Sequence, residues 1–164
     1  MSLEEKIGQM FINLGSSFDE EYLEQVVTKY HVGGVRYNPG TARQVYEQNA
    51  YMQKKAKIPL LIAANMESGG NGACIDGTLV GNPVQIGATK DSRFAYEMGR
   101  ISGVEGAAVG CNWSFAPVVD INYNWRNPVA ATRCFGDDPD TVLSMSLEYF
   151  RGIRESGIAC AMTE

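Results

Sequence analysis

The length, composition and charge of this chain limit what it can be. It has 164 residues, of which 45% are hydrophobic and 20% are charged, so we expect one globular domain spanning residues 1–164. Its formal net charge of −5 repels nucleic-acid phosphates and anionic lipids, and no apolar run approaches the roughly 20 residues of a membrane span. Neither nucleic acid nor a membrane is therefore an expected partner.

The start of the chain and its cysteines indicate a cytoplasmic protein without a cofactor. Residues 1–14 carry Glu4, Glu5 and Lys6 where a signal peptide is apolar, which favours the cytoplasm. The cysteines are far apart in the sequence and form no C-x-x-C pair, so we expect free thiols, no metal and no other cofactor. They are Cys74, Cys111, Cys134 and Cys160.

The first predicted elements are a helix, a strand and a second helix. Ser2 and Glu5 have the spacing of a capping box, which predicts a short opening helix. The apolar residues 10–14 predict the first strand. Residues 19–30 place their large apolar side chains on one helical face, with acidic residues in the first turn, where they oppose the helix dipole.

Strands and helices continue to alternate in the middle of the chain. Residues 32–37 predict a strand, and Thr41 with Gln44 caps a helix that runs to residue 52. Residues 59–64 form a nearly continuous apolar strand. Such two-sided burial is typical of a parallel sheet covered by helices.

The last third of the chain repeats the same order after a long loop. A glycine-rich loop covers residues 68–87, and a helix capped by Asp91 follows it and reaches residue 101. Residues 113–121 predict a fourth strand. A helix with proline in its first turn spans residues 139–154, and residues 158–163 predict the fifth strand.

The fold class follows from this alternation. Five parallel strands, four connecting helices and a short N-terminal helix predict an α/β protein with a partial (β/α)₈ barrel. A complete barrel needs about 250 residues, so we expect this chain to be the first part of one and not to close by itself. Its open sheet edges predict a homo-oligomer or pairing with a complementing barrel half.

Four segments carry a resemblance to one enzyme family. Residues 60–70 read LLIAANMESGG, similar to L-L-I-x-x-D-x-E-G-G with one inserted serine. Residues 112–121 read NWSFAPVVDI, similar to N-x-x-F-A-P-V-x-D-V, and residues 132–139 read TRCFGDDP, similar to x-R-x-F-G-x-D-P. Residues 158–164 read IACAMTE, similar to the strand that leads into K-H-F-P-G. In this order they resemble the N-terminal barrel of glycoside hydrolase family three, and the resemblance covers essentially the whole chain.

The resemblance implies a retaining hydrolase of β-N-acetylglucosaminides or β-glucosides. The family's nucleophile is an aspartate on a later strand, and in its N-acetylhexosaminidase branch a His-Asp dyad after the fifth strand is the acid/base. Both positions lie beyond this chain, so no catalytic residue is assigned here. We expect part of a carbohydrate-binding subsite, without activity of the chain alone. The alternative is a non-catalytic half-barrel that binds sugar weakly or assembles with another chain.

Four residues at the carboxyl ends of the strands are the candidate substrate-binding residues. Arg133 offers a fork of donors for sugar hydroxyls, and Asp120 is predicted to pair with it. Asn65 stands where the family usually has an aspartate, and it keeps an acceptor without the charge. Glu67 is assigned to the same site. Three of them have a structural alternative: a salt bridge that fixes a loop for Arg133, an amide that satisfies loop backbone groups for Asn65, and a structural role under the glycine-rich loop for Glu67.

Other conspicuous side chains remain unassigned. His31 is the single histidine, but it precedes its strand and so belongs to the opposite, structural end of a barrel. Tyr123 and Trp125 could stack on a sugar or pack within their loop. Arg36 and Tyr37 finish the second strand, and the sequence does not decide whether they reach the site.

Overall fold

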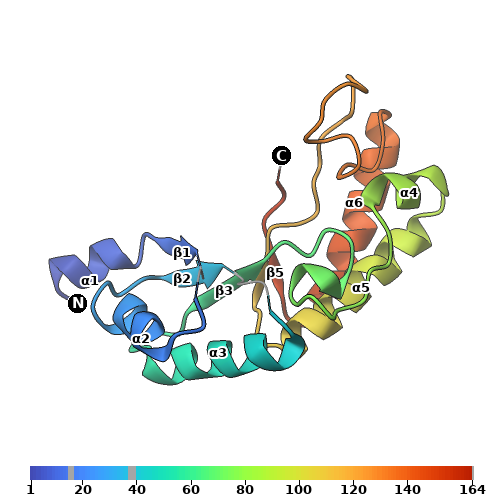
Figure 1. Cartoon of the computed structure of the whole chain (residues 1–164). Helices are drawn as coiled ribbons and strands as arrows, with labels where there is room; N and C mark the ends of the chain where they lie inside the picture. The colour runs from blue at the N-terminus through green and yellow to red at the C-terminus, as the bar shows by residue number, and fades with distance from the viewer. Residues whose placement is uncertain (15–16, 37–39, 164) are drawn as a thin grey trace.

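A parallel sheet of five strands forms the centre of the chain (Figure 1). The computed structural model describes residues 1–14, 17–36 and 40–163. The strands lie side by side in the same order as in the sequence, and every neighbouring pair is parallel. They are β1 (Ile12–Leu14), β2 (Gly34–Arg36), β3 (Leu61–Ala64), β4 (Trp113–Ser114) and β5 (Ala159–Cys160). This arrangement confirms the predicted partial (β/α)₈ barrel.

Helices connect the strands and begin where the sequence signals predict. Both predicted capping boxes are present, one formed by Ser2 and Glu5 and the other by Thr41 and Gln44. None of the helices in the described ranges is long and apolar enough to cross a membrane. The helices are α1 (Leu3–Gly8), α2 (Glu20–Thr28), α3 (Ala42–Lys55), α4 (Pro83–Ala88), α5 (Ser92–Ala108) and α6 (Pro139–Arg154), with a 3₁₀ turn η1 (Gly70–Gly72).

Several elements differ from the prediction in extent: α5 runs to Ala108 and not to 101, and β5 covers only Ala159–Cys160 of the predicted 158–163. Two further differences involve prolines. The predicted strand 113–121 is regular only at β4, followed by a single bridge between Val118 and Thr163. Pro117 interrupts it because proline has no N–H to give to a strand ladder. The predicted loop 68–87 contains α4, whose signal was present in the sequence: Pro83 occupies the first turn, and the backbone N–H of Asn82 donates to the Gln85 side chain at 2.8 Å.

Side chains alternate between the two faces of the sheet. Val35 and Ile62 are buried in the main apolar core together with residues of the covering helices. Leu61 points the other way and is 46% exposed. The α-carbon of Gly34 faces that same side, because a β-carbon added there would lie 2.7 Å from Ile12 Cδ1 and 2.9 Å from Leu61 Cβ. The sheet therefore has one face packed against helices and one inner face with exposed apolar side chains.

Helices α5 and α6 pack closely against each other beside the last two strands (Figure 1). A glycine makes this approach possible. A β-carbon on Gly99 would lie 2.2 Å from the carbonyl oxygen of Tyr149, so only glycine fits there. The contact places Tyr149, which is fully buried, beneath the loop that follows β3.

The cysteines are free thiols, as predicted. Cys74, Cys111 and Cys134 are buried and Cys160 is partly buried. Burial raises the pKa of the Cys111 thiol to about 12. A thiol with so high a pKa is almost entirely protonated at neutral pH, which suits a packing role.

Candidate functional site

The candidate residues lie beyond the carboxyl ends of two neighbouring strands. Asn65 directly follows β3, with Glu67 two residues later, and Asp120 and Arg133 belong to the segment that follows β4. Because β3 and β4 are parallel neighbours, the loops after them leave the sheet at the same rim. In a (β/α)₈ barrel this rim carries the chemistry.

Glu67 and Arg133 form the central contact of this rim. Arg133 Nε donates to Glu67 Oε2 at 2.8 Å, and Nη2 donates to Oε1 at 2.7 Å. The Glu67 side chain is 13% exposed and that of Arg133 34%. The hydrogen bonds to Glu67 raise the pKa of Arg133, more than burial lowers it. Such a parallel, charge-assisted fork fixes the plane of the guanidinium group.

The prediction that Arg133 pairs with Asp120 is therefore wrong, because its partner is Glu67. Asp120 is close enough to add an electrostatic contribution to the raised pKa of Arg133, but the ion pair is made by Glu67. The physical reason is that the loop after β3 carries Glu67 across to the segment after β4, where both of its oxygens meet the fork. Asp120 stays half-buried beside the pair.

The loop that carries Glu67 is anchored from below. The backbone carbonyl of Met66 accepts hydrogen bonds from the hydroxyls of Tyr149 on α6 and Ser102 on α5. Burial raises the pKa of Tyr149, so its hydroxyl stays protonated and remains a donor. Sequence reasoning missed both anchors, because nothing in the sequence relates Met66 to a tyrosine 83 residues away.

The glycine-rich loop beyond Glu67 is tied to α5. Glu105 accepts hydrogen bonds from the backbone N–H of Thr78 at 2.7 Å and from its hydroxyl at 2.5 Å. Gly69 forms a bridge with Leu79 and has a φ of +130°, a conformation that favours glycine. These contacts hold both ends of the loop together above the sheet.

Asn65 presents a buried acceptor to the rim. Its Oδ1 atom is buried and has no hydrogen-bond partner within the residues that the structure describes. Buried polar atoms in folded proteins are nearly always paired, so this acceptor is free to take a hydrogen bond from a group at the rim. The structural alternative for Asn65, an amide that satisfies the loop backbone, requires a partner that the described residues do not supply.

Tyr123 and Trp125 lie on an exposed stretch between Asp120 and Arg133. Their exposed fractions are 81% and 76%. The guanidinium carbon of Arg126 lies 4.8 Å from the centre of the Trp125 ring. Further along the same stretch, Asn127 Oδ1 accepts a hydrogen bond from the backbone N–H of Val129 at 2.9 Å. The aromatic rings do not pack into the core, so sugar stacking remains an open prediction for them.

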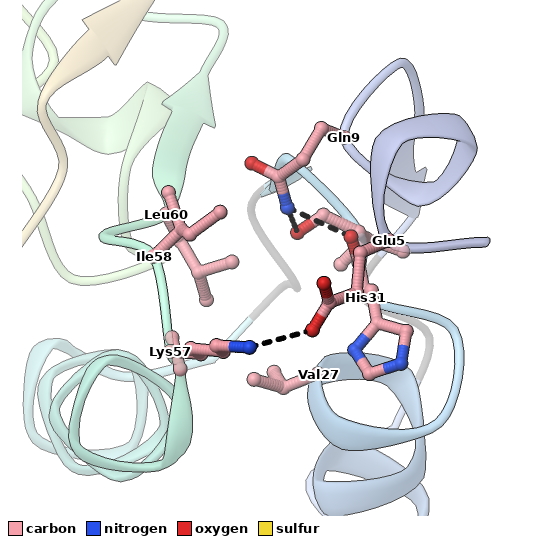
Figure 2. A pocket seen from close by; sticks show the side chains of 9 residues that line it. Glu5, Gln9, Val27, His31, Lys57, Ile58 and Leu60 are labelled. Atoms are coloured by element: carbon pink, nitrogen blue, oxygen red, sulfur yellow. Dashed lines mark hydrogen bonds and ion pairs between the residues drawn. The ribbon is translucent and has the colours of Figure 1, made fainter. Parts of the chain in front are cut away.

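His31 lies at the other end of the sheet, as expected. It borders a cavity of about 20 Å³ near the amino ends of β2 and β3, shown in Figure 2. Its carbonyl oxygen accepts a hydrogen bond from Gln9 Nε2 at 2.8 Å, and nearby Lys57 pairs with Glu5 at 2.7 Å. A cavity of this size holds about one water molecule. It is too small for a sugar.

The comparisons with known proteins identify the family. Residues 2–163 match the model of the glycosyl hydrolase family 3 N-terminal domain. The chain belongs to glycosyl hydrolase family 3. The assignment rests on a match over nearly the whole chain. Among the residues placed by the structure, no group of three or more side chains is suited to hold a metal ion.

Relatives and solved structures agree with this assignment. A Cellulomonas fimi protein named beta-N-acetylglucosaminidase/beta-glucosidase is 38% identical over 98% of this chain and 28% of its own length. A structure titled beta-glucoside phosphorylase bound to 2FGlc is 36% identical with a TM-score of 0.95, over 100% of this chain and 30% of that one. A Paenibacillus family 3 beta-N-acetylglucosaminidase is 30% identical with a TM-score of 0.90, over 100% and 33%. The chain thus spans about a third or less of each.

The contact between Glu67 and Arg133 is testable by a double-mutant cycle. We expect Glu67→Gln and Arg133→Met each to lower the free energy of unfolding, and the double variant to lose less than their sum by about 1–2 kcal/mol, because each single change leaves a half-buried charge unpaired. Urea unfolding measures the four values. The matched control is the highly exposed pair Arg43 and Glu47, for which no measurable coupling is expected. Equal coupling in both pairs would contradict the assigned role.

Proposed function

We propose that this chain supplies the sugar-binding part of a retaining glycosidase that acts on β-N-acetylglucosaminides or β-glucosides. The observation that carries the proposal is the fork between Glu67 and Arg133 at the carboxyl rim, beside the unpaired acceptor of Asn65. Two relatives support the substrate class by their names. They are the Cellulomonas fimi protein and a Pseudoalteromonas piscicida protein named beta-hexosaminidase A, which is 30% identical over 85% of this chain and 26% of its own length.

Each rim residue has a defined task in this proposal. Glu67 occupies Nε and Nη2 of Arg133 and so leaves the remaining guanidinium donors for ring hydroxyls. Asn65 Oδ1 accepts a hydrogen bond from another hydroxyl, and Asp120 takes a third. A sugar held by fixed partners is oriented before the reaction, and such bonds strengthen as positive charge develops on the ring.

The bond-breaking groups belong to barrel strands beyond β5 in this proposal. A retaining glycosidase has a nucleophile and an acid/base about 5 Å apart, which displace the leaving group and then pass the glycosyl unit to water. The five strands of this chain position the sugar for those groups. A non-catalytic half-barrel that binds sugar weakly is the alternative.

A second candidate reaction is transfer of the glycosyl unit to phosphate. It is favoured by the similar structure titled beta-glucoside phosphorylase. In that reaction a phosphate oxygen forms the new bond to the anomeric carbon, the glycosidic bond breaks, and the leaving alcohol takes up a proton. The sugar-binding residues have the same tasks in both reactions, so the identity of the product separates the two.

A chimera tests the proposed activity. Residues 1–164 replace the matching segment of the Cellulomonas fimi relative, and release of p-nitrophenol from aryl β-N-acetylglucosaminide and β-glucoside is measured. We expect an active chimera, an inactive lone chain, and about a 100-fold lower kcat/KM for Arg133→Met, because a misplaced sugar loses near-attack geometry. Analysis of the products in phosphate buffer distinguishes free sugar from glycosyl phosphate.

The chimera needs its own controls. Circular dichroism establishes that each variant is folded, and Arg100→Met on α5 makes the same charge change away from the rim. Full activity of Arg133→Met, or activity of the lone chain, would contradict the proposal.

We also propose that the chain associates through the open edges of its sheet, with a complementing barrel half or with a second copy. Leu61 and Leu14 on the inner face are 46% and 57% exposed, and Phe11 beside β1 is 60% exposed. Unpaired strand edges with exposed apolar groups favour pairing with another chain. A complementing half would cover the same groups that the remaining strands cover in a closed barrel.

Sedimentation measures this association. We expect dimers or larger assemblies of the isolated chain, which Leu61→Glu shifts towards monomers because it places a charge on the covered face. Val104 is similarly exposed, at 51%, but lies on α5, so Val104→Glu is the matched control and leaves the assemblies unchanged. A stable monomer at all accessible concentrations would refute association of the chain with itself.

A further inference from the structure

Arg36 lies on the inner face of the sheet, at the same rim as the proposed sugar site. It is the last residue of β2 and is in register with Leu14 of β1 and Ala63 of β3. Residues in register on parallel strands point to the same face. That face is the inner one, because Arg36 is two residues from Gly34, while Val35 between them is buried among the helices.

One donor of the Arg36 side chain is unpaired among the residues that the structure describes. The Nε atom is buried and has no hydrogen-bond partner within the described ranges 1–14, 17–36 and 40–163. Arginine carries a positive charge on a planar fork of donors. Arg36 itself is only partly buried, so its guanidinium stays reachable, while the buried Nε donor lacks the acceptor that such a group normally has. An anion would supply that acceptor together with a counter-charge.

The neighbouring residues do not neutralise Arg36. Asn65 lies two residues beyond Ala63 on the adjacent strand, and its buried Oδ1 is also unpaired. The amide of Asn65 is neutral, so it neither neutralises Arg36 nor repels an anion. The carboxylate of Glu67 is already bound by Arg133, and Asp120 lies after β4, one strand further away.

We propose that Arg36 and Asn65 form a subsite for a phosphate group. The guanidinium fork binds two phosphate oxygens, and Asn65 Oδ1 accepts a hydrogen bond from an adjacent sugar hydroxyl. The phosphate comes either from a phosphorylated sugar or from free inorganic phosphate bound beside the sugar. The sugar part of this inference rests on the proposed function, whereas phosphate binding by Arg36 does not.

Binding to the complete chain of 164 residues tests the subsite. Inorganic phosphate, glucose and glucose 6-phosphate are titrated separately and followed by calorimetry at low ionic strength. We expect Arg36→Met to weaken phosphate binding by more than about tenfold, because a charge-assisted fork is lost. Arg36→Lys keeps the charge without the fork, so it loses less phosphate affinity than Arg36→Met. Arg100→Met, which removes an arginine from the outer side of α5, leaves binding unchanged.

The two sources of phosphate give different results. Glucose 6-phosphate that binds more tightly than glucose or phosphate, with the gain lost in Arg36→Met, supports a phosphorylated sugar. Phosphate that binds together with unmodified glucose, and depends on Arg36, supports a free phosphate. Both results support the subsite.

Two results would overturn the phosphate subsite. A third result would overturn the proposed sugar site alone. Phosphate binding that is undetectable, or equal in the Arg36→Met and Arg100→Met variants, rejects the phosphate subsite. If Arg36→Met does not fold, the phosphate binding of Arg36→Lys is compared with that of Arg100→Met instead. Binding of phosphate through Arg36 without any binding of glucose or N-acetylglucosamine would reject the proposed sugar site while the phosphate subsite stands.

Discussion

The fork between Glu67 and Arg133 joins the two loops on which the whole rim depends. The fork fixes the two loops relative to each other through two hydrogen bonds between charged groups. The fork depends in turn on the Met66 carbonyl, which Tyr149 and Ser102 hold from α6 and α5. Helix packing behind the sheet thus determines where a guanidinium group lies in front of it.

Much of the fold was predictable because its signals are local. Capping boxes at Ser2 and Thr41 marked the helix starts, and apolar runs marked all five strands, since both depend on residues close together in the sequence. The extent of β4 was not predicted, because Pro117 interrupts its ladder. The start of α4 was overlooked, although Pro83 and Gln85 signalled it.

The position of the four candidate residues relative to the sheet was predictable, but their contacts were not. The carboxyl-rim rule placed Asn65, Glu67, Asp120 and Arg133 correctly with respect to the sheet. It does not say which carboxylate meets Arg133, because that depends on how far each loop extends over the rim. The charge of Arg36 was likewise visible, but only the strand register shows that it points to the inner face beside Asn65.

An NMR titration of the chain with N-acetylglucosamine tests the central claim most directly, namely that this rim binds a sugar. The account predicts that the amide signals of Asn65, Glu67, Asp120 and Arg133 shift with one common dissociation constant, while those of His31 and Lys57 at the opposite end of the sheet stay in place. Shifts confined to the amino end, or no shifts at saturating sugar, would contradict it.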